Sequence, residues 1–133
     1  MKLSTKSEYA CLALIDLTEN YPDKLVRTEY ISRRKKIPKK YLEQILLILK
    51  RRGYLKSKTG LNGGYSLMKA PDKITLAEII RLMDGALAPV GSVSKYFYET
   101  TPVDQSQKLL KIFREIRNYI SDKLEQTTFA DLK

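Results

Sequence analysis

Residues 28–67 combine two short helical patterns with two alternating apolar segments, and few folds accept that order. The periodicity predicts a helix from residue 28 to about 35 and another from 38 to about 52. The alternating segments YLKSK and YSLMK lie on either side of the glycines of TGLNGGYSL, residues 59–67. No helix follows these glycines directly, and the G-x-G-x-x-G spacing of a dinucleotide site is absent. They are therefore expected to turn a β-hairpin, and the whole segment predicts a winged helix-turn-helix.

The rest of the chain is mostly helical in pattern. A dense apolar stripe predicts a helix over 4–19, and a capping box at Thr75 starts another over 76–84. A long amphipathic helix is expected from 106 to about 126, after a stretch with no sustained period. The predicted fold is mostly α with a small β-hairpin wing and a long C-terminal dimerisation helix. The expected units are a winged-helix DNA-binding domain (1–86), a connecting loop (87–105), and the dimerisation helix with its tail (106–133).

Apolar side chains at helical spacing define the predicted core. In the helix that begins near Pro38 they are Leu42, Ile45, Leu46 and Leu49. In the preceding helix, Tyr30 and Ile31 are expected to point inward and the basic residues that follow them outward.

The net charge of +10 is concentrated in one part of the chain. Residues 24–58 hold 13 lysines and arginines against two acids, Glu29 and Glu43, and the remainder is nearly balanced. A basic excess confined to a strongly patterned segment predicts a polyanionic partner, with nucleic acid favoured over an anionic membrane. The chain has one cysteine, Cys11, which excludes an internal disulfide and suggests a reducing, cytoplasmic compartment.

The predicted hairpin and the helix before it carry groups suited to DNA. Glu43 and Gln44 lie near the start of that helix, and such side chains can bond cytosine N4 and adenine respectively. In the wing, the residues that could lie against a DNA backbone or minor groove are Lys56, Lys58, Thr59, Asn62 and the amides of Gly63 and Gly64.

Several stretches in order resemble one family over nearly the whole chain: MKLSTKSEYA, IPKKYLEQIL, GYLKSKTGLNGGYSL, ITLAEIIRLMDG and TTFADL. The chain is similar to the dimeric winged-helix regulators that include the iron–sulfur cluster regulator, the nitric-oxide-sensing nitrite repressor and the cysteine metabolism repressor. The resemblance implies a homodimer on a palindromic operator, with the helix after Pro38 in the major groove and the wing along the minor groove.

The resemblance also places individual residues. It assigns DNA-facing roles to Lys40, Tyr41, Glu43 and Gln44, and phosphate contacts to Ser4, Thr5 and Lys6 at the start of the first helix. The complete expected DNA-contacting set is Ser4, Thr5, Lys6, Lys39, Lys40, Tyr41, Glu43, Gln44, Lys56, Lys58, Thr59, Asn62, Gly63, Gly64 and Tyr65. The expected dimer stripe is Leu109, Ile112, Phe113, Ile116, Ile120 and Leu124.

The chain departs from the family pattern in the connecting loop. Cluster-binding members carry three cysteines there, whereas this loop has none and the whole chain has no histidine. Serine and threonine are poor ligands for an iron–sulfur cluster, so we expect no cluster and no other cofactor. An alternative is that Ser92 and Ser106 replace ligand cysteines in a natural or engineered cluster-free form. In the wing, Thr59 stands where the family usually has arginine, which weakens the expected minor-groove contact.

Other functions remain open at this point. An enzyme is disfavoured, because the chain lacks histidine, a phosphate-binding loop and an evident carboxylate pair. A non-specific basic module that binds nucleic acid or acidic proteins is a second alternative. The regulatory input could be a partner protein, a small molecule near Tyr96, Phe97 and Tyr98, or nothing. We expect these three aromatics to pack against the dimerisation helix.

Overall fold

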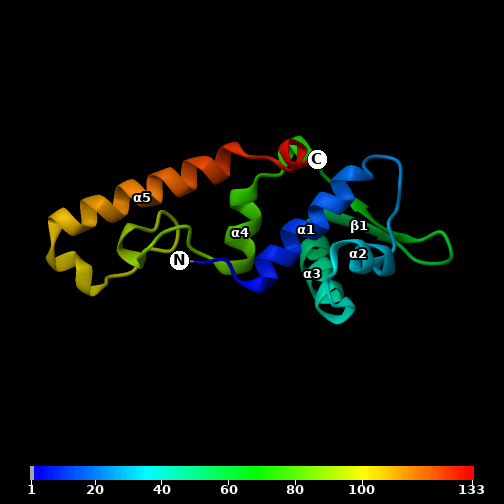
Figure 1. Ribbon diagram of the computed structural model, residues 1–133, viewed down its shortest axis with the longest axis horizontal. Coiled ribbons are helices and arrows are strands. Elements are labelled where there is room, and N and C mark those ends of the chain that lie inside the picture. Colours follow the sequence, from blue (N-terminus) through cyan, green and yellow to red (C-terminus); the bar gives the residue numbers. More distant parts are fainter. Residues whose placement is uncertain (1) are drawn as a thin grey trace.

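Three helices and a hairpin form one end of the molecule, and a long helix extends from the other end (Figure 1). The computed structural model describes residues 2–133. Its helices and strands are α1 (Thr5–Glu19), α2 (Thr28–Lys35), α3 (Lys39–Arg51), β1 (Leu55–Lys58), β2 (Gly64–Leu67), α4 (Leu76–Asp84) and α5 (Gln107–Gln126). Short 3-10 turns η1 to η4 cover Pro71–Lys73, Gly91–Val93, Pro102–Gln105 and Phe129–Leu132. This order confirms the predicted winged helix-turn-helix.

The apolar face of α3 forms the centre of the winged-helix core. Leu42, Ile45, Leu46 and Leu49 are all buried, as predicted. Ile31 of α2 is fully buried, but the expectation that Tyr30 points inward is wrong, because its side chain is 47% exposed. The eight-residue α2 offers only Ile31 to the core, and its neighbour lies at the edge of the buried face. There Tyr30 lies under the guanidinium groups of Arg33 and Arg34, 5.5 and 5.9 Å from its ring centroid.

An ion pair with a buried carboxylate joins α2 to α1. Arg34 Nε and Nη2 donate to the two carboxylate oxygens of Asp16, each at 2.8 Å. Asp16 is almost fully buried, whereas the Arg34 side chain is half exposed. A buried carboxylate is costly unless it is paired, so this bidentate contact fixes how the two helices pack.

At Gly64 the hairpin leaves no room for a side chain. Strands β1 and β2 are antiparallel, with Leu55 opposite Leu67 and Lys58 opposite Gly64. Gly64 has φ +149°, and a Cβ there would lie 2.6 Å from the carbonyl oxygen of Val26. Val26 in turn exchanges two 2.8 Å backbone hydrogen bonds with Tyr65, which joins a third extended segment to the hairpin. The glycines therefore allow this close approach of backbones.

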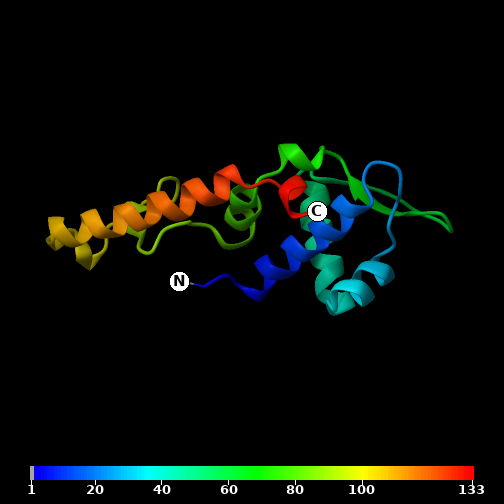
Figure 2. The ribbon, with the colours of Figure 1, turned by 45° about the horizontal axis from the view of Figure 1, so that its top comes forward.

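The last residues return to the winged-helix core, as Figure 2 shows for the C-terminus beside α1. Phe129 is fully buried, and its amide donates to the Ile74 carbonyl at 3.0 Å. Thr128 forms a β-bridge with Thr75, and η4 packs on α1. Residues 128–132 therefore pack with the winged-helix elements, through contacts between residues distant in the sequence.

The predicted capping box at the start of α4 is confirmed. Thr75 Oγ1 accepts from the Glu78 amide, and the Glu78 carboxylate accepts from the Thr75 amide. Ile79 and Ile80 are buried on this helix. The hydroxyl of Tyr54 also donates to Glu78 at 2.7 Å, which ties the wing to α4.

The segment between α4 and α5 lies alongside α5, whose inner side contacts α4, η2 and η3. Leu110 and Ser121 are buried on that side, and Arg81 of α4 pairs with Glu125 at 2.7 Å. The aromatic trio lies at the surface of the single chain, with Tyr96, Phe97 and Tyr98 60%, 49% and 67% exposed, and Tyr96 and Phe97 line a small hollow with Arg117 and Ser121 of α5. Ser92, Val93 and Ser94 are the buried residues of this loop.

Within residues 2–133, no helix is long and apolar enough to cross a membrane.

Candidate nucleic-acid interface

The first turns of α3 present a polar surface opposite the buried face. The residues of α3 that are expected to contact DNA are all exposed: Lys39, Lys40, Tyr41, Glu43 and Gln44. Lys39 Nζ lies 3.1 Å from a carboxylate oxygen of Glu29 on α2 but 4.0 Å from that of Glu43. A hydrogen bond from its own backbone amide, together with the bond from Lys39, lowers the pKa of Glu29. Lys39 is therefore held mainly by Glu29, which leaves the Glu43 carboxylate available to another donor.

The start of α1 lies beside this surface, and there Ser4 forms hydrogen bonds within the chain. Its hydroxyl accepts from the Ser7 amide at 3.1 Å as the N-cap of α1. The same hydroxyl and the Ser4 amide donate to the Asp84 carboxylate at the end of α4. Partial burial acts to raise the pKa of Asp84, but the hydrogen bonds from Ser4 outweigh it and the pKa is lowered. Thr5 and Lys6 remain exposed.

A hollow of about 450 Å³ joins the ends of α1 and α3 into one surface. Its walls combine polar groups of Thr5, Lys6 and Gln44 with apolar groups of α3. The rings of Tyr9 and Tyr41 both line it, with centroids 6.4 Å apart and planes tilted by 44°. Sequence reasoning did not select Tyr9, although it follows Thr5 by four residues and so shares its face of the helix.

The wing provides fewer free groups than expected. Lys56, Lys58, Thr59 and Asn62 are exposed. Gly63 is buried, and its amide donates to the Gly60 carbonyl at 3.0 Å within the turn. Tyr65 packs against the core, with both of its backbone groups bonded to Val26. The structure therefore gives Gly63 and Tyr65 roles in shaping the wing, and Gly64 pairs with Lys58 inside the hairpin.

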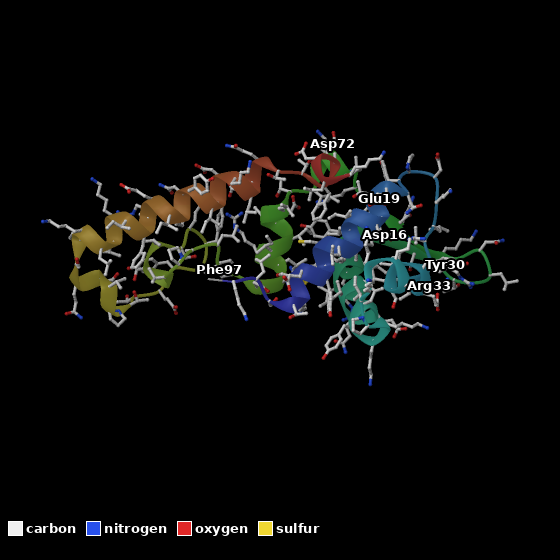
Figure 3. All side chains as sticks on the ribbon, viewed as in Figure 1. Asp16, Glu19, Tyr30, Arg33, Asp72 and Phe97 are labelled. Carbon is white, nitrogen blue, oxygen red and sulfur yellow. The ribbon has the colours of Figure 1, made fainter. Side chains whose placement is uncertain are left out.

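Further cations that the sequence did not single out border the same surface. Figure 3 shows Arg33 and Tyr30 on the outer side of α2, next to the hairpin. Arg27 is exposed just before α2, and its Nη2 lies 3.4 Å from the Gly60 carbonyl oxygen in the wing turn. The concentration of charge over residues 24–58 predicts such cations, but their position beside the wing depends on how the elements pack.

Residues 3–133 match the model of the Rrf2 family, described as an iron-dependent transcriptional regulator. The chain belongs to the Rrf2 family. It is 30% identical over 132 residues to the HTH-type transcriptional regulator CymR of Bacillus subtilis, covering 99% of this chain and 89% of CymR. The solved structure of CymR (YrzC), the global cysteine regulator of B. subtilis, matches with a TM-score of 0.80 at 30% identity, over 99% of this chain and 95% of that one. The structure of T. potens IscR matches with a TM-score of 0.77 at 26% identity, and the match covers 99% of this chain and 85% of that one.

Membership of the Rrf2 family makes the chain a DNA-binding transcriptional regulator, and these relatives are regulators rather than enzymes.

Ser92 and Ser106, the two serines considered as replacements of ligand cysteines, are both engaged in hydrogen bonds. Ser92 Oγ lies 2.5 Å from Thr101 Oγ1, and Ser106 Oγ accepts from the Leu109 amide at 3.2 Å as the N-cap of α5. Burial, with a smaller contribution from Asp84, raises the pKa of the Cys11 thiol to about 11. Over residues 2–133, no group of three or more His, Cys, Asp or Glu is arranged to hold a metal ion.

Proposed function

We propose that this Rrf2-family protein is a sequence-specific repressor that binds a palindromic operator as a homodimer. The observation that carries the proposal is the exposed polar face of α3, which combines Glu43 and Gln44 with lysines on the most basic part of the chain. Carboxylate and amide side chains suit base edges in the major groove, whereas lysines suit phosphates. Thr5 and Lys6 on α1 and the lysines of the wing extend this surface on either side.

An exposed apolar stripe on α5 supports the homodimer. Leu109, Ile112 and Tyr119 are 37%, 53% and 75% exposed, and Ile116 lies between them at helical spacing. Such a stripe in water favours a partner surface, and a second copy provides an identical one around a two-fold axis. Ile120 and Leu124, from the same expected stripe, line an open hollow with Leu3 and Ile80 of their own chain. The proposed interface keeps the expected stripe and adds the exposed Tyr119: Leu109, Ile112, Phe113, Ile116, Tyr119, Ile120 and Leu124. A two-fold dimer matches a palindromic operator.

The input signal is proposed to be something other than an iron–sulfur cluster. Clusters need thiolate or imidazole ligands, and the loop between α4 and α5 offers Ser92, Thr101 and Ser106 instead. Cys11 lies on α1, and its raised pKa disfavours the thiolate that a metal requires. Iron and acid-labile sulfide analysis of anaerobically purified protein tests this part of the proposal, and bound iron would contradict it.

Glu43 and Lys56 are expected to act differently on DNA. If Glu43 accepts a hydrogen bond from a base, Glu43→Ala should relax discrimination at one operator position by about 1–3 kcal/mol. Binding of that variant to random DNA should hold or tighten, because a charge repelled by phosphates has been removed. Lys56→Ala should weaken binding to all duplexes alike and reduce the salt slope by about one unit.

An operator is first selected from a random-sequence pool. Fluorescence anisotropy then measures the affinity of each variant for this operator, for its single-base variants and for random duplex at several salt concentrations. A Glu43→Ala protein that loses affinity uniformly, with its base preferences intact, would show that Glu43 only orients its neighbours. A wild-type protein that binds operator and random duplex equally would support the non-specific basic module instead.

A further inference from the structure

Arg27 lies where the segment before α2 meets the wing. Its neighbour Val26 is buried and bridged to Tyr65 of β2. Because side chains alternate along extended backbone, Arg27 points away from the core and is exposed. Its Nη2 donates to the Gly60 carbonyl over 3.4 Å, so the guanidinium lies against the turn of the wing.

The charge of Arg27 is only partly balanced by its surroundings, since Glu29 feels it at longer range without forming an ion pair with it. Across residues 2–133, no carboxylate lies within ion-pair distance of it. Glu29, two residues away, pairs with Lys39 at 3.1 Å. Asp23 lines the same open hollow beside the wing tip as Arg27 and Leu61, without forming an ion pair with Arg27. A guanidinium carries five N–H donors, so most of those of Arg27 are available after the bond to Gly60.

The hairpin itself contains no arginine, since its cations are Lys56 and Lys58. A lysine ammonium is strongly hydrated and suits an exposed phosphate, whereas the planar guanidinium is more weakly hydrated. Narrow, A·T-rich minor grooves carry an enhanced negative potential that attracts inserted arginines. We propose that Arg27, delivered from outside the hairpin, is the residue of the wing surface that enters the minor groove beside each half-site and favours A·T pairs there. This inference rests on the proposed operator binding.

The test compares three operators that differ only in the segment beneath the wing: A·T, G·C and inosine·cytosine pairs. Inosine·cytosine lacks the N2 amino group, so its minor groove resembles that of A·T while its major groove resembles that of G·C. The wild-type protein should bind the A·T and inosine·cytosine operators roughly tenfold more tightly than the G·C operator. Arg27→Ala should bind all three equally, near the wild-type affinity for G·C, and Arg27→Lys should lose most of the preference.

Lys24→Ala is the matched control, because Lys24 is an exposed cation lining the same hollow and its removal should leave the preference intact. Equal loss of affinity on all three operators with Arg27→Ala would show a phosphate contact and overturn the inference. A wild-type protein that binds its operator without preference among the three would also overturn it, while the proposed function would stand. Failure to distinguish any operator from random duplex would overturn both.

Discussion

Replacing Phe129 by alanine should lower the free energy of unfolding by about 3–5 kcal/mol, the range for removing a buried aromatic ring. The ring is fully buried in the core formed with α1, although it lies only four residues from the C-terminus. The backbone amide of residue 129, which donates to the Ile74 carbonyl, is retained in alanine, so the variant measures the packing of the ring. Chemical denaturation followed by circular dichroism, at a fixed protomer concentration, measures the effect.

Phe97→Ala is the matched control, since it removes the same ring from a side chain that is 49% exposed. We expect it to change stability by less than about 1 kcal/mol. A Phe129→Ala protein as stable as the wild type would mean that the tail does not pack on α1 in solution.

Placing a charge on the exposed stripe of α5 should dissociate the proposed dimer. Ile116→Asp introduces an unpaired carboxylate, and a two-fold interface contains the substitution twice. At about 2–3 kcal/mol for each buried, unpaired charge, the cost is roughly 4–6 kcal/mol, or a weakening of dimerisation by about a thousandfold or more. Sedimentation velocity over a range of protomer concentrations measures the change.

Asn118→Asp adds the same charge to the exposed polar side of α5 and should leave the dimer unchanged. An Ile116→Asp protein that still sediments as a dimer at micromolar concentration would refute the interface on α5. Circular dichroism shows whether each variant is folded, which separates dissociation from unfolding.

Local signals in the sequence were enough to predict the framework. The capping box of Thr75 and Glu78, the four leucines and isoleucines of α3 and the glycine turn each depend on residues a few positions apart. The geometry of helices and hairpins alone links such short-range patterns to structure, so they can be read without knowing how distant segments pack. The family resemblance added the expected roles of these elements.

The features that the sequence did not reveal depend on contacts between distant residues. Ser4 looks like a free hydroxyl at a helix start, but Asp84 lies 80 positions away and engages it. Phe129 looks like part of a polar tail until the bridge between Thr128 and Thr75 brings it to the core. Arg27 is one of many cations in the basic segment, and only the packing of the wing sets it apart.

Comparing the affinity for a selected operator with that for random duplex tests the central claim most directly. The operator is obtained by selection from a random-sequence pool, and both affinities are measured by anisotropy from low to physiological salt. We predict a two-fold symmetric operator that binds at least about a thousandfold more tightly than random duplex at physiological salt. Both affinities should fall as salt increases, because phosphate contacts release counterions. A selection that enriches no symmetric sequence, with equal affinities for the enriched and random duplexes, would contradict the account.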